Sequence, residues 1–293
     1  MLHGSYGTLG IITKLTFKLL AAKPYVRMRY EHFSRFDAFW TFLKERCDQG
    51  DYELVDAIIH GPELFVACLG NMVDHAPRVS SYERENVYYK STRQLHSDYL
   101  TTPGYCFRYD ADCHWLSRTV PPLENRLVRR LLGGQLLGST NLITWSKRLR
   151  PLLRLQRRPD VVVDVFIPKR NFERFFRWYE KAFDFWPLWI VPYRAPEMYP
   201  WLADGHQDKM GESFFIDCAV YGKPNSERHV DHSEVLERKV LELGGIKTLI
   251  SRNHYDRDTF WSIYSQPRWQ AVKERTDPRN LFGDLYTRMH PET

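Results

Sequence analysis

Residues 25–31 read YVRMRYE, and from Val26 onward apolar and charged side chains alternate. Val26, Met28 and Tyr30 share one face of the segment, and two arginines and a glutamate share the other. A period of two residues predicts a β-strand, and a strand with one buried and one solvated face is typical of antiparallel sheets. This stretch therefore favours a fold built on an antiparallel sheet.

Working outward, the strand opens a strand–helix–strand–strand unit, and a similar unit occurs later in the chain. We expect Ser34 to cap the first helix and Gly61-Pro62 to join the two strands that follow it. The predicted elements are a strand at 25–31, a helix from 34, strands at 53–60 and 63–69, a strand at 160–167, a helix at 169–183, strands at 188–193 and 213–221, a helix at 230–243 and a strand at 247–254. The sequence thus predicts an α+β fold with helices covering one face of an antiparallel sheet.

A basic segment at about 97–158 separates the two units. The formal charge of the 293-residue chain is +6, and the excess lies between residues 126 and 158. We interpret the segment as a mostly helical insertion, since these apolar side chains can share one helix face: Val128, Leu131, Leu132 and Leu136. Such a basic amphipathic stretch can lie on a membrane surface, or pack as a lid with a solvated basic face. No nucleic-acid-binding motif accompanies the arginines, so we expect no nucleic-acid partner.

Cysteine usage and hydropathy bear on location. The five cysteines form no CxxC pair and are odd in number, which is typical of reduced thiols in a reducing compartment. No run approaches the ~20 apolar residues that span a bilayer, and no signal peptide is visible. We expect a cytoplasmic protein that can lie peripherally on a membrane. The glycine-rich start, without a preceding element, is typical of a chain that begins partway through a larger protein.

The first motif is GSYGTLGIIT at residues 4–13, with glycines three apart. A predicted strand at 9–20 follows it, whereas a Rossmann loop needs a helix there and a Walker loop needs Lys-Ser/Thr after the last glycine. By spacing alone the motif is a glycine-rich turn, or a place where backbone closely approaches a flat ligand. We expect the 9–20 strand to be an unpaired sheet edge that favours self-association.

Residues 4–19, GSYGTLGIITKLTFKL, resemble the closing segment of the FAD-binding domain in vanillyl-alcohol-oxidase-type flavoproteins, most closely the delta-24 sterol reductase branch. The resemblance continues in order along the chain. It covers VVVDVFIP at 161–168, PLWIVP at 187–192, DCAVYG at 217–222, and 245–286 with its DPRNLF motif. It implies that residues 1–21 end the FAD-binding domain and that 22–293 form a ferredoxin-like cap domain on the substrate side of the flavin.

The resemblance also implies a site. Backbone near the first motif and one C-terminal residue would contact FAD: Gly4, Ser5, Gly7, Thr8, Gly10, Ile11, Ile12 and Asn280. Residues at the end of the last predicted strand would handle the proton or stabilise charge: His254, Tyr255 and Arg252. One wall of an apolar substrate pocket would be Trp186, Trp189 and Tyr193. The pyrophosphate-binding loops of the family have no counterpart here, so FAD binding by this chain alone would be weak or absent.

Three functional hypotheses follow. The first is an FAD-dependent oxidoreductase acting on a lipid-like substrate, sterol or isoprenoid, with an apolar cavity. The second is an oxidase of a sugar alcohol or hydroxy acid, which would have a small polar cavity. The third is a non-catalytic cap or interaction module, which would partner a separate N-terminal FAD-binding polypeptide. We expect no metal site, because the His229–His232 pair, with His206 upstream, lacks both the zinc-protease pattern and a third ligand.

Overall fold

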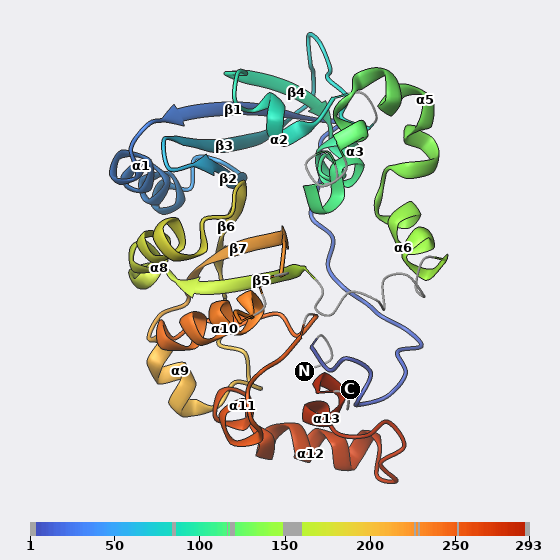
Figure 1. Cartoon of the computed structure of the whole chain (residues 1–293), viewed down its shortest axis with the longest axis vertical. Helices are drawn as coiled ribbons and strands as arrows, with labels where there is room; N and C mark the ends of the chain where they lie inside the picture. Colours follow the sequence, from blue (N-terminus) through green and yellow to red (C-terminus); the bar gives the residue numbers. More distant parts are fainter. Residues whose placement is uncertain are drawn as a thin grey trace.

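The computed structural model describes residues 4–83, 86–115, 117, 121–148, 160–225, 227, 229–250 and 252–290. Its centre is one eight-stranded sheet in the order β4-β1-β3-β2-β6-β7-β5-β8, in which every pairing is antiparallel (Figure 1). The strands are β1 (Tyr25–Phe33), β2 (Leu54–Gly61), β3 (Leu64–Val73), β4 (Ser97–Thr101), β5 (Val161–Pro168), β6 (Leu188–Arg194), β7 (Phe214–Lys223) and β8 (Ile246–Lys247). The predicted α+β class is confirmed.

The sheet consists of two halves with the same internal order. In each half the third strand lies between the first two, and the fourth lies beside the first. The second half, with α8 (Phe172–Trp178) and α10 (His232–Glu242), has the βαββαβ order of ferredoxin-like folds. The halves meet where β2 and β6 pair over only three residues each, Ala57–Ile59 with Leu188–Ile190.

Aromatic helices cover one face of the sheet (Figure 1). Phe36 of α1 (Phe36–Gln49) and Phe176 of α8 stack with ring centroids 4.0 Å apart, so the two helices are joined across the boundary of the halves. Both rings belong to the main core, which continues under α10 through Leu236 and Val240. The prediction that Ser34 caps α1 is wrong. The helix begins one residue later than expected, and its N-cap residue is Arg35, whose side chain makes no capping hydrogen bond.

The opposite face of the first half is also covered, which the sequence did not predict. Tyr82, Tyr88 and Trp115 pack there against β1 and β3. The short helix α2 (Tyr88–Ser91) precedes the insertion, and the insertion supplies the others: α3 (Thr102–Cys106), η1 (Asp110–Trp115), η2 (Pro121–Glu124), α5 (Arg126–Leu136) and α6 (Ser139–Arg148). Residues 97–101, assigned above to a helical insertion, are the edge strand β4, and 149–159 lie outside the described residues.

Two strand predictions are wrong. Residues 9–20 form no strand: Leu9 is buried, but residues 10–22 run exposed along the outside of the molecule, with Phe17 and Leu19 in solvent (Figure 1). A strand needs a hydrogen-bonding neighbour, and none is within this chain's described residues. The last predicted strand, 247–254, is reduced to β8, because Thr248 onward turns away from β5 after one more contact with Asp164.

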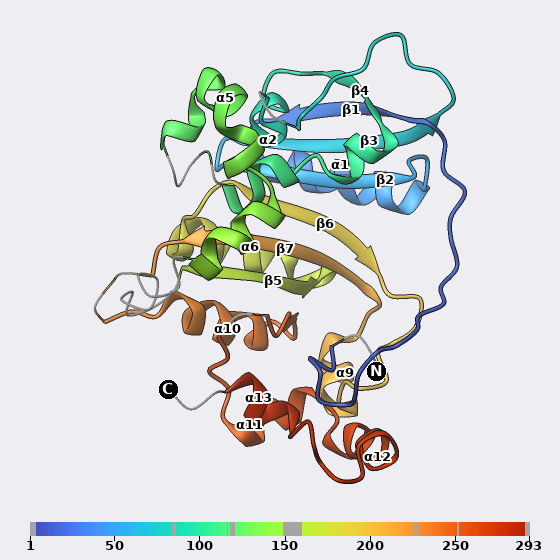
Figure 2. The same ribbon diagram turned by 90° about the vertical axis from the view of Figure 1, so that its right-hand side faces the viewer.

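Four further helices complete the chain: α9 (Asp204–Met210), α11 (Arg257–Ile263), α12 (Gln266–Thr276) and α13 (Leu285–Met289). They form a second core beyond the end of the sheet, and the N-terminal turn joins it through Leu9 (Figure 2). Asn280 does not cap the last helix, because the side chain that caps α13 is Asp284. Within the described ranges, no helix has the length and apolar character needed to span a bilayer.

Candidate functional site

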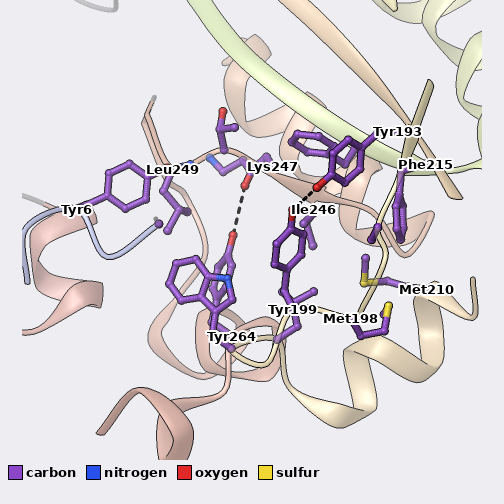
Figure 3. A pocket seen from close by; sticks show the side chains of 16 residues that line it. Tyr6, Tyr193, Met198, Tyr199, Met210, Phe215, Ile246, Lys247, Leu249 and Tyr264 are labelled. Atoms are coloured by element: carbon purple, nitrogen blue, oxygen red, sulfur yellow. Dashed lines mark hydrogen bonds between the residues drawn. The ribbon is translucent and has the colours of Figure 1, made fainter. Parts of the chain in front are cut away.

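A cavity of about 290 Å³ lies between the end of the sheet and the second core. The N-terminal turn, the end of β6, α9 and the segment after β8 each provide part of its wall, so it is assembled from both ends of the chain (Figure 3). Its lining is almost entirely apolar or aromatic: Gly4, Tyr6, Phe166, Tyr193, Ala195, Met198, Tyr199, Trp201, Leu202, Met210, Phe215, Ile246, Lys247, Thr248, Leu249 and Tyr264. Such a wall, with few polar groups, is typical of a small-molecule site for an apolar ligand.

Tyrosine hydroxyls supply most of the polar groups at the cavity. The hydroxyls of Tyr193 and Tyr199 hydrogen-bond to each other across it (Figure 3). Burial, with the Tyr193 hydroxyl as a second cause, raises the pKa of Tyr199 to about 12, so Tyr199 is neutral at physiological pH. The Tyr6 hydroxyl accepts from the Leu249 amide at 2.9 Å and fixes the N-terminal turn to the opposite wall.

A buried ion pair stands behind the wall. Lys247 Nζ lies 2.5 Å from Glu237 Oε2, and both side chains are almost fully excluded from solvent. Lys247 Nζ also donates to the Arg252 carbonyl at 2.7 Å, and the Glu237 carboxylate accepts from the His254 amide at 3.0 Å. Burial lowers the pKa of Lys247, and Glu237 opposes that effect. The pair thus holds residues 252–254 against α10.

The structure brings the three residues predicted to be catalytic together, but around this ion pair and outside the cavity lining. Arg252 forms an ion pair with Asp231 at the N-terminus of α10, and His254 Nε2 lies 3.9 Å from the same carboxylate. Burial alone would raise the pKa of Asp231, but the Asn225 amide and the Arg252 guanidinium lower it to about 2. Burial also lowers the pKa of His254, which favours the neutral ring.

Tyr255, the third of these residues, is buried in the second core. Its hydroxyl lies 3.3 Å from the Glu237 carbonyl, to which it donates, so it points back into the network. Burial is the main cause that raises its pKa, with the Glu237 charge adding to it. The roles predicted for Arg252, His254 and Tyr255, in handling the proton or stabilising charge, stay predictions.

The two segments predicted to contact FAD meet in space. Lys273 of α12 is buried and donates to the Thr8 carbonyl at 2.6 Å and to the Gly283 carbonyl at 2.7 Å. Its ammonium also lies 2.5 Å from Asp277, whose carboxylate accepts the Leu281 and Phe282 amides. One lysine therefore holds the N-terminal glycine turn against the C-terminal DPRNLF loop, and sequence inspection did not single it out.

The predicted flavin contacts differ in accessibility. Gly4 lines the cavity, while Ser5 and Thr8 are buried. The Thr8 hydroxyl donates to the Ser5 carbonyl at 2.6 Å and so closes the turn. Gly7, Gly10, Ile11, Ile12 and Asn280 remain on the surface or half-buried. Asn280 has a φ of 51°, a left-handed conformation that Asn tolerates better than most residues. Part of the set is thus open to a ligand, and the buried part shapes the turn.

The predicted pocket residues of β6 are not all together. Tyr193 lines the cavity, whereas Trp189 lies elsewhere on the sheet and donates from Nε1 to Asp56 Oδ2 at 2.8 Å. Asp56 is buried and also pairs with Arg108 at 2.9 Å, so Trp189 belongs to a structural network. Trp186 packs against the main core and donates to Asp184 at 2.7 Å. Sequence analysis missed Tyr199 and Trp201, although the aromatic residues spaced along 193–201 could have indicated them.

A second hollow, of about 630 Å³, opens where β2 and β6 diverge beyond their short pairing. Asp217 of β7 is in its wall, and its Oδ1 atom is buried without a hydrogen-bond partner. Burial raises the pKa of Asp217 to about 8, and the nearby Asp164 carboxylate adds to the effect. Asp217 is therefore largely protonated at neutral pH.

The histidines weighed as metal ligands make separate contacts. His206 Nε2 lies 3.1 Å from the Gly245 carbonyl, and His232 Nε2 lies 3.0 Å from Glu227. Across the part of the chain that the structure describes, no three His, Cys, Asp or Glu side chains are grouped so that they can hold a metal ion.

Comparisons with known proteins agree with the motif resemblance. No family model matches the chain. The chain is 20% identical over 297 residues to Delta(24)-sterol reductase of Homo sapiens, and equally to that of Mus musculus; the match covers 97% of this chain and 57% of each relative. It is 20% identical over 306 residues to a Delta(24)-sterol reductase homolog of Caenorhabditis elegans. The chain thus spans little more than half the length of these relatives.

A solved structure, a VAO-type flavoprotein from Myceliophthora thermophila C1, aligns with 88% of this chain and 46% of its own, at a TM-score of 0.39 and 14% identity. The similarity to sterol reductases that the motifs indicate is confirmed along nearly the whole chain.

Proposed function

We propose that this chain is the substrate-side portion of an FAD-dependent oxidoreductase that acts on a sterol-like lipid. The observation that carries the proposal is the apolar cavity closed by the glycine turn, which Lys273 clamps to the C-terminal loop. The N-terminal segment expected near a flavin therefore borders the space expected for a substrate, and Lys273 holds the C-terminal segment against it. The similarity to Delta(24)-sterol reductases supports the choice of a sterol-like ligand.

The cavity suits one end of such a ligand. Its volume of about 290 Å³ is at the lower limit of the ~300–1,000 Å³ usual for small-molecule sites. In this proposal Met198, Met210 and Phe215 bind the apolar body, and the Tyr193–Tyr199 hydroxyl pair accepts or donates a hydrogen bond to a polar head. An apolar wall of this kind argues against the small polar cavity that a sugar-alcohol or hydroxy-acid oxidase would need.

The residues of this chain fit only part of an FAD site. Gly7, Gly10, Ile11, Ile12 and Asn280 would offer backbone or amide contacts to the ring system, and bound FAD would supply hydride chemistry there. The chain's own residues would orient the substrate and exclude water. Arg252, His254 and Tyr255 would act as positioning residues for the cavity wall, since the Glu237–Lys247 pair holds them behind it.

The exposed segment 10–22 favours a second candidate, a non-catalytic module that binds another polypeptide. Leu15, Phe17 and Leu19 are each more than half exposed, and exposed apolar side chains that occur together often mark interaction sites. A complementary FAD-binding polypeptide is the partner that we propose for this segment.

Two measurements on the purified chain test the proposal. Energy transfer from tryptophan to a fluorescent sterol should report binding in the cavity, and Ala195→Phe, which fills the cavity, should abolish it. Ala271→Phe, on the exposed side of α12, is the matched control. Sterol binding that Ala195→Phe leaves unchanged would refute the cavity as the site.

Visible absorption after incubation with FAD and desalting tests the cofactor. A retained flavin band supports the enzyme proposal. A colourless folded chain that self-associates in light scattering favours the interaction module, because the apolar segment 10–22 would then be seeking a partner.

A further inference from the structure

Helix α5 is packed with an arginine toward the protein and leucines toward solvent. Arg129 is completely buried, whereas Leu127, Leu131 and Leu132 are 63%, 72% and 47% exposed. Val128 and Leu136 of the same helix pack inward against Leu123 and Leu137, but a surface helix normally turns charged side chains, not leucines, to solvent. The exposed apolar side of α5 therefore requires an explanation outside the described fold.

The orientation of α5 is fixed by Arg129. Its guanidinium lies 3.3 Å from Asp112 Oδ1 and donates to the Ala111 and Leu123 carbonyls at 3.2 and 3.4 Å. Asp112 is held in turn by the Ser117 amide at 2.8 Å. Rotating the helix to bury its leucines would leave this charge pair broken inside the protein, which is strongly unfavourable. The contacts of Arg129 thus keep the leucines of α5 exposed in the native state.

Helix α6 extends the same surface. Ile143 is 55% exposed, and Lys147 and Arg148 near its C-terminus are in solvent. Both helices stand on one side of the molecule, outside the layers of the sheet (Figure 2). The exposed cations of the two helices are Arg126, Arg130, Lys147 and Arg148, and neither helix contains an Asp or Glu. The surface is therefore apolar and basic at once.

We propose that the α5–α6 face docks on an anionic lipid surface. The face consists of Arg126, Leu127, Arg130, Leu131, Leu132, Ile143, Lys147 and Arg148. Its leucines alternate with cations along the helix, which is the pattern of helices that lie in a membrane interface. Four exposed cations, with no Asp or Glu in either helix, favour an anionic surface, which the anionic headgroups of a lipid bilayer supply. The proposal does not depend on the proposed function, since it concerns a surface remote from the cavity.

Co-sedimentation of the full chain with lipid vesicles tests this proposal. We expect binding to vesicles that contain phosphatidylserine, weak binding to vesicles of phosphatidylcholine alone, and loss of binding as ionic strength rises. The double variant Leu127→Gln/Leu131→Gln should lower the partition coefficient by on the order of tenfold or more, because each leucine would bury apolar area in the interface. Leu281→Gln, a leucine 67% exposed in the C-terminal loop, is the matched control and should bind like the wild type.

A second variant, Lys147→Glu/Arg148→Glu, should remove the preference for phosphatidylserine. Because it changes only exposed side chains, it still tests the proposal if circular dichroism shows that the leucine variant is misfolded. The proposal is overturned if the wild type binds neither vesicle, if it binds both equally without salt dependence, or if the folded variants bind unchanged. It is also overturned if light scattering shows a dimer that the leucine variant dissociates, since a second copy would then cover this face.

Discussion

Replacing Asp217 by Asn should make the chain progressively more stable than the wild type as pH rises from about 4 to about 8. The carboxyl group of Asp217 is in the wall of the second hollow, its Oδ1 atom has no hydrogen-bond partner, and burial beside Asp164 raises its pKa to about 8. In the unfolded chain the ordinary pKa of 3.8 applies. The folded state therefore binds this proton more tightly, and the wild type loses stability as pH rises through the interval between these values.

The magnitude follows from the two pKa values. At 1.36 kcal/mol per pH unit, the difference between 3.8 and about 8 corresponds to about 6 kcal/mol at the limit. The side chain is partly exposed, and solvent screening should reduce the measured effect to a few kcal/mol. Asn has nearly the same shape without the titration, so the variant should retain the stability that the wild type loses between about pH 4 and about pH 8.

Urea unfolding followed by circular dichroism, near pH 5 and near pH 9, measures the effect. The difference in unfolding free energy between variant and wild type isolates Asp217, because the other titrating groups are common to both proteins. Asp208→Asn, on the exposed side of α9, is the control and should show no pH-dependent difference. A difference between Asp217→Asn and the wild type that is the same at both pH values would refute the reasoning.

Two further changes test the contacts around the site. Glu237→Gln should lower the free energy of unfolding in urea by about 3–5 kcal/mol, because Lys247 would stay buried without its charged partner. The control Glu242→Gln, in an exposed pair with Lys239, should lower it by less than about 1 kcal/mol. Equal effects of the two substitutions would contradict the assignment of a buried ion pair. Lys273→Met should increase amide hydrogen exchange in residues 4–9 and 277–283 without changing exchange in the sheet, and unchanged exchange in both segments would show that the lysine does not hold them together.

The local pattern of apolar residues was sufficient to predict the strands that bury at least one face against the core. The alternation at 25–31 predicted β1, and the apolar runs at 161–168 and 214–221 predicted two strands of the second half, because a period of two is fixed by strand geometry itself. The same logic failed at 9–20. Its alternation is genuine, but a strand exists only where a neighbour accepts its hydrogen bonds, and no described strand lies beside it.

The site shows the same division. Residue types and motifs indicated the resemblance to sterol reductases, and they predicted a pocket wall of Trp186, Trp189 and Tyr193, of which Tyr193 lines the cavity. Only the tertiary structure decided that Lys273 joins the ends, that Trp189 serves Asp56, and that Arg252, His254 and Tyr255 gather around a buried Glu237–Lys247 pair. The physical reason is sequence separation: Lys273 and Thr8 are 265 residues apart, and contacts over such distances depend on how whole layers pack, which no local period encodes.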